Sequence, residues 1–223
     1  MFSKELGLKL DKYHLLKHPF YQKYWNEGKL TREIIKDYAE QYYQHVKAFP
    51  RYISATHSIC EDLEKRKILL ENLQDEENKD GDHPKLWKNF AKAMGADEKE
   101  IENVKLDWFT KDMIDNFFSQ ARKSYAEGLA SLYTYERQIP EIAETKIQGL
   151  KKFYGVNSKE GLEFFEAHKS ADVIHRAECE KLLDGLSKEE QVKAEKASVL
   201  TARYLWNFLS GMTSKHKLEQ IAA

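Results

Sequence analysis

Residues 31–50 read TREIIKDYAEQYYQHVKAFP, and this stretch decides the class of the fold. It opens with a threonine, a residue that commonly caps the N-terminus of a helix. Apolar and aromatic residues then return at the spacing of one helical face, at Ile34, Ile35, Tyr38, Tyr42 and Val46. The pattern predicts an amphipathic helix that begins near Thr31 and breaks at Pro50, because proline cannot donate the helical hydrogen bond.

The composition of the whole chain favours the same, all-α class. The chain has 223 residues, of which only 10 are glycine and 4 are proline, about half the share of these turn formers in an average protein. Charged residues make up 33% of the chain, as expected for long helices with one solvated face. Turn-rich β architectures are therefore disfavoured.

The breaks in the helical pattern indicate roughly seven helices in one bundle. After the helix at 31–50 a short helix follows, and further helices are expected over about 62–77, 85–94, 98–120, 159–185 and 187–210. Residues 124–153 form one long helical pattern, which we expect Pro140 to kink rather than end. No linker divides the chain, so residues 1–212 are predicted to form a single domain, with a frayed tail at 213–223.

Charge and hydropathy exclude several classes of partner. The 36 basic and 37 acidic residues give a net charge of −1, without the basic patch typical of nucleic-acid binding. No apolar stretch is long enough to span a bilayer, and the N-terminus lacks the apolar segment of a secretion signal. We therefore expect a cytoplasmic protein that binds neither nucleic acid nor membranes. The two cysteines, Cys60 and Cys179, are isolated, which favours reduced core thiols over a disulfide between them.

Residues 166–175, EAHKSADVIH, carry the strongest chemical signal. At roughly 100° per helical residue, His168, Asp172 and His175 lie on one face. Imidazole with carboxylate is a ligand mixture that suits iron and manganese. The alternative is a solvated polar stripe, and a metal site would need further carboxylates.

Two other positions can supply them. Glu136 lies in an apolar stretch, where a carboxylate must be paired, protonated or bound to a metal; a salt bridge with Arg137 or Arg122 is the alternative. Glu76 or Glu77 ends a predicted helix, and His83 follows across a loop; here the alternative is a solvated helix end. Together with the residues at 168, 172 and 175 they would supply six oxygen and nitrogen ligands, enough for two metal ions in a bundle core.

Tyrosines and one lysine form a second group of candidates. The chain has 12 tyrosines, most of them expected in the core with their hydroxyls hydrogen-bonded, although one or two beside a redox metal could be oxidised. Lys146 follows Glu136 by about three helical turns, so it could approach the same cavity. A desolvated lysine has a lowered pKa and can act as a base or an amine, whereas a snorkelling surface lysine is the alternative.

Several short motifs along the chain together resemble those of a known family. They are FY at 20–21, YA at 38–39, YY at 42–43, HVKAFPRY at 45–52, DEEN at 75–78, YTYERQIP at 133–140, KIQGL at 146–150, and the spaced His, Ala-Asp-Val and His of 168–175. Over about residues 14–210 they closely resemble the family of the chlamydial protein associating with death domains. More distantly the chain is similar to pyrroloquinoline-quinone synthase and the haem-oxygenase-like dimetal oxidases.

The resemblance implies a seven-helix haem-oxygenase-like bundle that holds a di-iron or iron–manganese centre. The ligands that it implies are Glu76, His83, Glu136, His168, Asp172 and His175. It also implies synthesis of 4-aminobenzoate for folate, with O₂ and an external reductant as co-substrates, an internal tyrosine consumed as the ring source and a lysine as the amino donor. By position these would be Tyr21 and Lys146, with Tyr38 and Tyr135 as nearby redox partners.

Other functions remain open from the sequence. An oxygenase of the same fold could act on an external small molecule over many turnovers. A host-interaction protein that binds death domains is a different class of function, and such a protein would be a secreted effector. For each of these functions, and for 4-aminobenzoate synthesis as well, we expect a homodimer.

Overall fold

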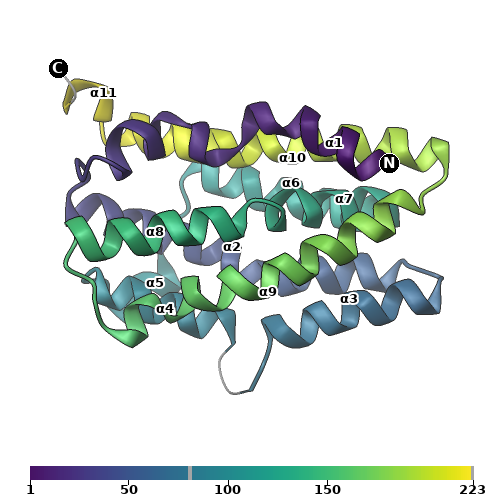
Figure 1. Ribbon diagram of the computed structural model, residues 1–223. Helices are drawn as coiled ribbons and strands as arrows, with labels where there is room; N and C mark the ends of the chain where they lie inside the picture. The colour runs from purple at the N-terminus through teal and green to yellow at the C-terminus, as the bar shows by residue number, and fades with distance from the viewer. Residues whose placement is uncertain (80–81, 222–223) are drawn as a thin grey trace.

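The computed structural model describes the backbone of residues 1–79 and 82–221, and the side chains of the same residues apart from 170–172 and 221. Within this part of the chain every regular element is helical, as Figure 1 shows, so the predicted all-α class is confirmed. The α-helices are α1 (Phe2–Leu10), α2 (Arg32–Ser58), α3 (Leu63–Glu76), α4 (His83–Ala93), α5 (Glu98–Asn103), α6 (Trp108–Lys123), α7 (Tyr125–Glu136), α8 (Ile139–Phe153), α9 (Lys159–Asp184), α10 (Lys188–Lys215) and α11 (Leu218–Ile221).

Short helical segments join α1 to α2. Two are single 3₁₀ turns, η1 (Asp11–Tyr13) and η2 (Leu15–Lys17). The third, η3 (Phe20–Trp25), is a π-helix that follows Pro19. π-Helical turns are rare and often lie at functional sites, so the position of Tyr21 in η3 favours a functional role for this tyrosine.

Helix α7 forms the centre of the bundle. It packs against α10, α6, α9 and α2, and every residue from Ala126 to Glu136 is buried. A helix that is buried on all sides has no solvated face for a charged side chain. Glu136, at the C-terminal end of α7, is therefore held inside the protein at 1% exposure.

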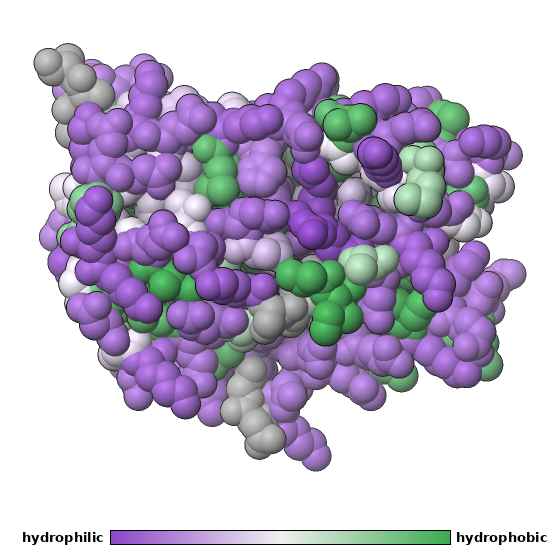
Figure 2. Space-filling view, in the orientation of Figure 1, coloured by the Kyte–Doolittle hydropathy of each residue, from purple (hydrophilic) through white to green (hydrophobic). Residues whose placement is uncertain are grey.

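The outer helices complete the bundle around α7. Helix α9 packs against α8 and α4, and α2 packs against α6, α4 and α3. The N-terminal helix α1, in purple, lies beside the long helix α10, in yellow, in Figure 1. The face seen in Figure 2 is largely hydrophilic with scattered apolar residues, as expected for amphipathic helices around a shared core.

The predicted effects of Pro50 and Pro140 on their helices are both wrong. Helix α2 does not break at Pro50 but continues to Ser58, and Phe49, Tyr52 and Ile53 on either side of the proline are buried. This packing outweighs the hydrogen bond that the proline removes. The pattern at 124–153 is not one kinked helix, because α7 ends at Glu136 and α8 begins at Ile139. Pro140 lies in the first turn of α8, where its missing N–H group costs nothing.

Several smaller expectations can be compared with the fold. Cys60 and Cys179 are both buried free thiols, so the alternative of a disulfide is not realised. Of the tail at 213–223, residues 213–215 complete α10, and Leu218 in α11 is fully buried. No helix in the described ranges is long and apolar enough to cross a membrane.

Candidate active site

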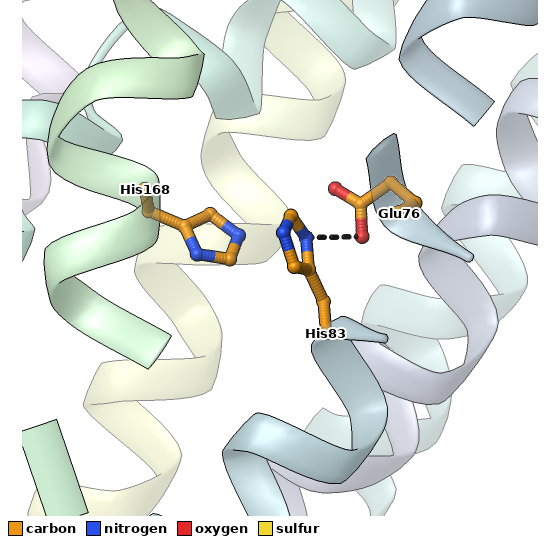
Figure 3. A group of neighbouring side chains, drawn as sticks. All are labelled: Glu76, His83 and His168. Carbon is orange, nitrogen blue, oxygen red and sulfur yellow. Dashed lines mark ion pairs between the residues drawn. The ribbon is translucent and has the colours of Figure 1, made fainter. Parts of the chain in front are cut away.

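Three of the predicted ligands meet inside the bundle. Glu76 ends α3, His83 begins α4 and His168 lies in the middle of α9. One ligand atom from each of the three lies within 4.8 Å of those of the other two, and Figure 3 shows the side chains converging. His83 Nδ1 lies 2.7 Å from Glu76 Oε2, and all three side chains are buried. Glu77, the alternative to Glu76, is exposed at the end of α3.

The start of α4 is built to place His83. Asp82 caps the helix by accepting a hydrogen bond from the backbone N–H of Lys85 at 2.8 Å. Pro84 follows at a first-turn position, where proline is tolerated. Residues 80 and 81 of the predicted loop lie outside the described residues.

His168 is oriented by its own helix. Its Nδ1 lies 2.7 Å from the carbonyl oxygen of Phe164, which can only accept, so Nδ1 carries the proton. The lone pair is then on Nε2, and the ring lies against that of His83 with 4.1 Å between centroids. Burial, followed by the charge of His83, lowers the pKa of His168 well below its ordinary value, so the imidazole is neutral. A neutral imidazole with its other nitrogen hydrogen-bonded is the state in which histidine binds a metal.

Two more predicted ligands lie on α7 and α9 and are held by other partners. Glu136 accepts hydrogen bonds at Oε1 from Asn72 Nδ2 at 2.6 Å and at Oε2 from Cys179 Sγ at 3.4 Å. His175 is buried and its Nε2 lies 3.1 Å from Asp75 Oδ2. Among the described residues, the converging group consists of Glu76, His83 and His168 and includes neither Glu136 nor His175.

The remaining assignments concern Asp172 and Arg137. The side chain of Asp172 lies outside the described residues, so the structure does not test it as a ligand. Arg137, the neighbour considered as a salt-bridge partner for Glu136, instead pairs with Asp11 at 2.6 Å.

A small cavity lies next to His168. Its lining includes all four of the predicted catalytic residues, Tyr21, Tyr38, Tyr135 and Lys146, together with His168 itself. The space open to the centre of a water molecule is about 20 Å³, enough for about one water. Residues from η3, α2, α7, α8 and α9 thus meet around one small void.

Lys146 is a buried amine in this cavity. It projects from α8, is 4% exposed and donates a hydrogen bond from Nζ to the Tyr38 hydroxyl at 2.6 Å. The amine also lies over the faces of the Tyr38 and Trp87 rings, 4.7 and 5.1 Å from their centroids. Burial lowers the pKa of Lys146 to about 7, so a large share of the amine is neutral near neutral pH.

The tyrosines form hydroxyl pairs. Tyr21, at 1% exposure in η3, interacts through its hydroxyl with that of Tyr38. Burial and then the neighbouring tyrosines raise the pKa of both groups, so the two phenols are neutral. A hydrogen bond also links Tyr42 to Tyr135. The Tyr38 hydroxyl therefore lies between the phenol of Tyr21 and the amine of Lys146.

Sequence reasoning gave no role to three residues around the site. Asn72 and Asp75 lie on α3 within one turn of Glu76 and bond to Glu136 and His175. Trp87 is fully buried, and its ring contacts those of Tyr42 and Phe164. Asn72 could have been found from the sequence, because it lies one helical turn before Glu76. Nothing in the sequence pattern distinguished Trp87 from an ordinary core residue.

Comparisons with known proteins identify relatives of this chain in sequence and in fold. The chain is 42% identical to the 4-aminobenzoate synthase of Chlamydia muridarum over 209 residues, which cover 93% of this chain and 88% of that relative. It is 38% identical to the 4-aminobenzoate synthase of Nitrosomonas europaea over 225 residues, which cover 95% of this chain and 90% of the relative.

A solved structure supports the predicted fold type. A domain of unknown function with a haem-oxygenase-like fold from Shewanella denitrificans superposes with a TM-score of 0.80 at 16% identity, covering 99% of this chain and 94% of that one. The haem-oxygenase-like bundle is thereby confirmed. Residues 4–215 match the TENA/THI-4/PQQC family, and the chain belongs to that family.

Proposed function

We propose that this protein makes 4-aminobenzoate, using its own Tyr21 as the source of the ring and Lys146 as the amino donor. The names of the relatives at 38–42% identity support the product. The observation that carries the mechanism is the cavity, which brings Tyr21 and Lys146 together with His168.

The size of the cavity favours an internal substrate. A site for a small organic molecule usually encloses hundreds of cubic ångströms, roughly 300–1,000 Å³. The cavity beside His168 has space for about one water, a size that suits dioxygen rather than a second aromatic molecule. A tyrosine that already forms part of the cavity wall needs no such space. This observation counts against an external substrate over many turnovers.

The donor set of three converging side chains suits a metal ion. Glu76, His83 and His168 converge, and the Phe164 carbonyl leaves His168 Nε2 with a lone pair. Buried carboxylates and neutral imidazoles suit iron and manganese. We propose that the pair of ions is held by Glu76, His83, Glu136, His168, Asp172 and His175. When bound, the pair would activate O₂ with electrons from an external reductant.

The residues of the chain would then accept the proton of the phenol and supply the amino nitrogen. Oxidation of the Tyr21 phenol requires that its proton leave, and the Tyr38 hydroxyl lies beside it with the Lys146 amine behind. The product would contain the ring and Cβ of Tyr21, so the bond between Cα and Cβ must break and Cβ must be oxidised to the carboxylate, with O₂ as the oxidant. Where nitrogen replaces the phenol oxygen, that oxygen leaves as water, and the Cε–Nζ bond of Lys146 breaks and leaves an aldehyde at Cε, which is a further oxidation by O₂. The neutral amine of Lys146 is the nitrogen source within reach of the same cavity. Each chain would therefore turn over once.

A turnover count tests this function. Protein loaded with Fe(II) and Mn(II) is exposed to O₂ and a reductant, and the 4-aminobenzoate formed is counted per chain. We expect no more than one product molecule per chain, with the side chain of Tyr21 missing from the peptide map. Many products per chain with Tyr21 intact would assign the protein to the class of oxygenases that act on an external small molecule.

A further inference from the structure

Helix α3 contacts three proposed ligands on other helices through one polar face. Asn72 reaches Glu136 on α7, Asp75 reaches His175 on α9, and Glu76 contacts His83 on α4. Residues three and four positions apart on a helix are neighbours on its surface. Of these three side chains only Glu76 is a proposed ligand, and Asp75 has no role in the function described above.

The contact between Asp75 and His175 favours one tautomer of the imidazole ring. His175 Nε2 lies 3.1 Å from Asp75 Oδ2, and a carboxylate oxygen can only accept. In the neutral ring Nε2 therefore carries the proton and Nδ1 carries the lone pair. His168 has the opposite arrangement, since its Nδ1 donates to the Phe164 carbonyl at 2.7 Å.

We infer that Asp75 is a positioning residue that makes His175 bind its metal ion through Nδ1, whereas His168, on the same helix, binds through Nε2. This inference rests on the dimetal centre of the proposed function. Nε2 lies at the tip of the ring and Nδ1 lies next to the main chain. The two histidines thus present ligand atoms at different distances from the α9 backbone, and a histidine in the wrong tautomer directs an N–H group at the ion.

The position of Asp75 makes it suitable for mutation. Its side chain is 57% exposed, whereas that of His175 is 5% exposed, so replacing the aspartate leaves the core intact. A matched control lies one turn earlier on α3 at Glu71, which is also exposed. Burial, and then the charges of Glu71 and Asp75, raise the pKa of Glu178. Both carboxylates therefore contribute negative charge to the same part of α9. Glu71→Ala therefore removes the same charge without removing the hydrogen bond to His175.

Manganese binding gives the first test. Mn²⁺ is titrated into the metal-free protein, and the free ion is followed by its EPR signal. We expect wild type and Glu71→Ala to bind two ions alike, and Asp75→Ala to keep the first ion but to bind the second about 10–100-fold more weakly. Asp75→Asn keeps an acceptor oxygen and should fall closer to wild type. Equal effects of Asp75→Ala and Glu71→Ala would overturn the inference, because the role of Asp75 would then be charge alone.

The tautomer gives a second test that needs no metal. Long-range ¹H–¹⁵N correlation spectra of the metal-free protein, with His175 assigned by His175→Gln, report which ring nitrogen carries the proton. We expect Nε2–H at His175 and Nδ1–H at His168 in the wild type, with the first preference lost in Asp75→Ala. A proton on Nδ1 of His175 in the wild type would overturn the inference. Failure of wild type to bind two ions would instead contradict the proposed dimetal function, while the tautomer would still decide the role of Asp75.

Discussion

The Nζ atom of Lys146 lies 2.6 Å from the hydroxyl oxygen of Tyr38, and both side chains are almost wholly buried. The contact joins α8 to α2 across the cavity that His168 and Tyr21 also line. A lysine in such a place has lost its hydration, which favours the neutral amine over the ammonium form. The proposed chemistry depends on this state of the lysine.

Replacement of Lys146 should remove the nitrogen source. We expect Lys146→Met, which keeps the length of the side chain but not the amine, to fold and to yield no 4-aminobenzoate in a mass-spectrometric assay. Lys151→Met, which changes an exposed lysine on the same helix, is the control and should form product as wild type does. Normal yield from Lys146→Met would exclude Lys146 as the amino donor.

Product formation should depend on pH through the same amine. The pKa of Lys146 is lowered by burial to about 7, so the neutral amine predominates above that pH. We expect the rate of product formation to rise through pH 7 and to level off one to two pH units higher. A rate that falls as pH increases through this window would contradict a role for the neutral amine.

Stability should report the pKa independently of activity. Between about pH 7 and pH 10.5, the ordinary pKa of lysine, the unfolded chain binds a proton at Lys146 that the folded protein does not bind. The free energy of unfolding of wild type, relative to Lys146→Met, should therefore rise by up to about 1.4 kcal/mol per pH unit in this window. Below about pH 7 both states hold the proton, so the difference should be constant. Urea unfolding of both proteins at several pH values measures it.

The choice of tyrosine can be tested within one π-helix. Tyr21 and Tyr24 are both buried in η3, but only Tyr21 lines the cavity. We expect Tyr21→Phe to abolish product, since the ring then lacks the hydroxyl that pairs with Tyr38, whereas Tyr24→Phe should keep it. Product from Tyr21→Phe at the wild-type level would assign the consumed ring to another tyrosine.

Close packing of α7 against α2 should make one glycine hard to replace. A Cβ atom at Gly128 would collide with the side chain of Thr56, which is fully buried. We expect Gly128→Ala to lower the free energy of unfolding by about 1–3 kcal/mol, as overpacked cores do. At Gly185 a Cβ would meet its nearest atom, the Leu182 carbonyl oxygen, at 3.5 Å. Gly185→Ala should therefore be tolerated in the same urea titration.

The sequence predicts those parts of the fold that follow from the spacing of apolar residues, but it does not predict where prolines end helices. The start and the buried face of α2 follow from the spacing of its apolar residues, and Thr31 caps it by accepting from the N–H of Ile34. Whether a proline ends a helix depends instead on what packs beside it. Pro50 lies inside α2, whereas Pro140 lies in the first turn of α8 after the chain has already left α7.

The site shows the same division. Helical spacing placed His168 and His175 on one face of α9, and the burial of Glu136 followed from its apolar neighbours. The cavity depends on tertiary packing, because Tyr21 and Lys146 come from segments far apart in the chain. Likewise, no local pattern in the sequence shows that Asp75 hydrogen-bonds to His175 on a different helix.

Isotope labelling tests the central claim most directly. Protein made with ring-¹³C tyrosine and ε-¹⁵N lysine is loaded with Fe(II) and Mn(II) and then given O₂, a reductant and unlabelled free tyrosine and lysine. The account predicts 4-aminobenzoate that carries both labels, with residue 21 reduced to its backbone in the peptide map. Unlabelled product, or an intact Tyr21 in protein that has formed product, would contradict it.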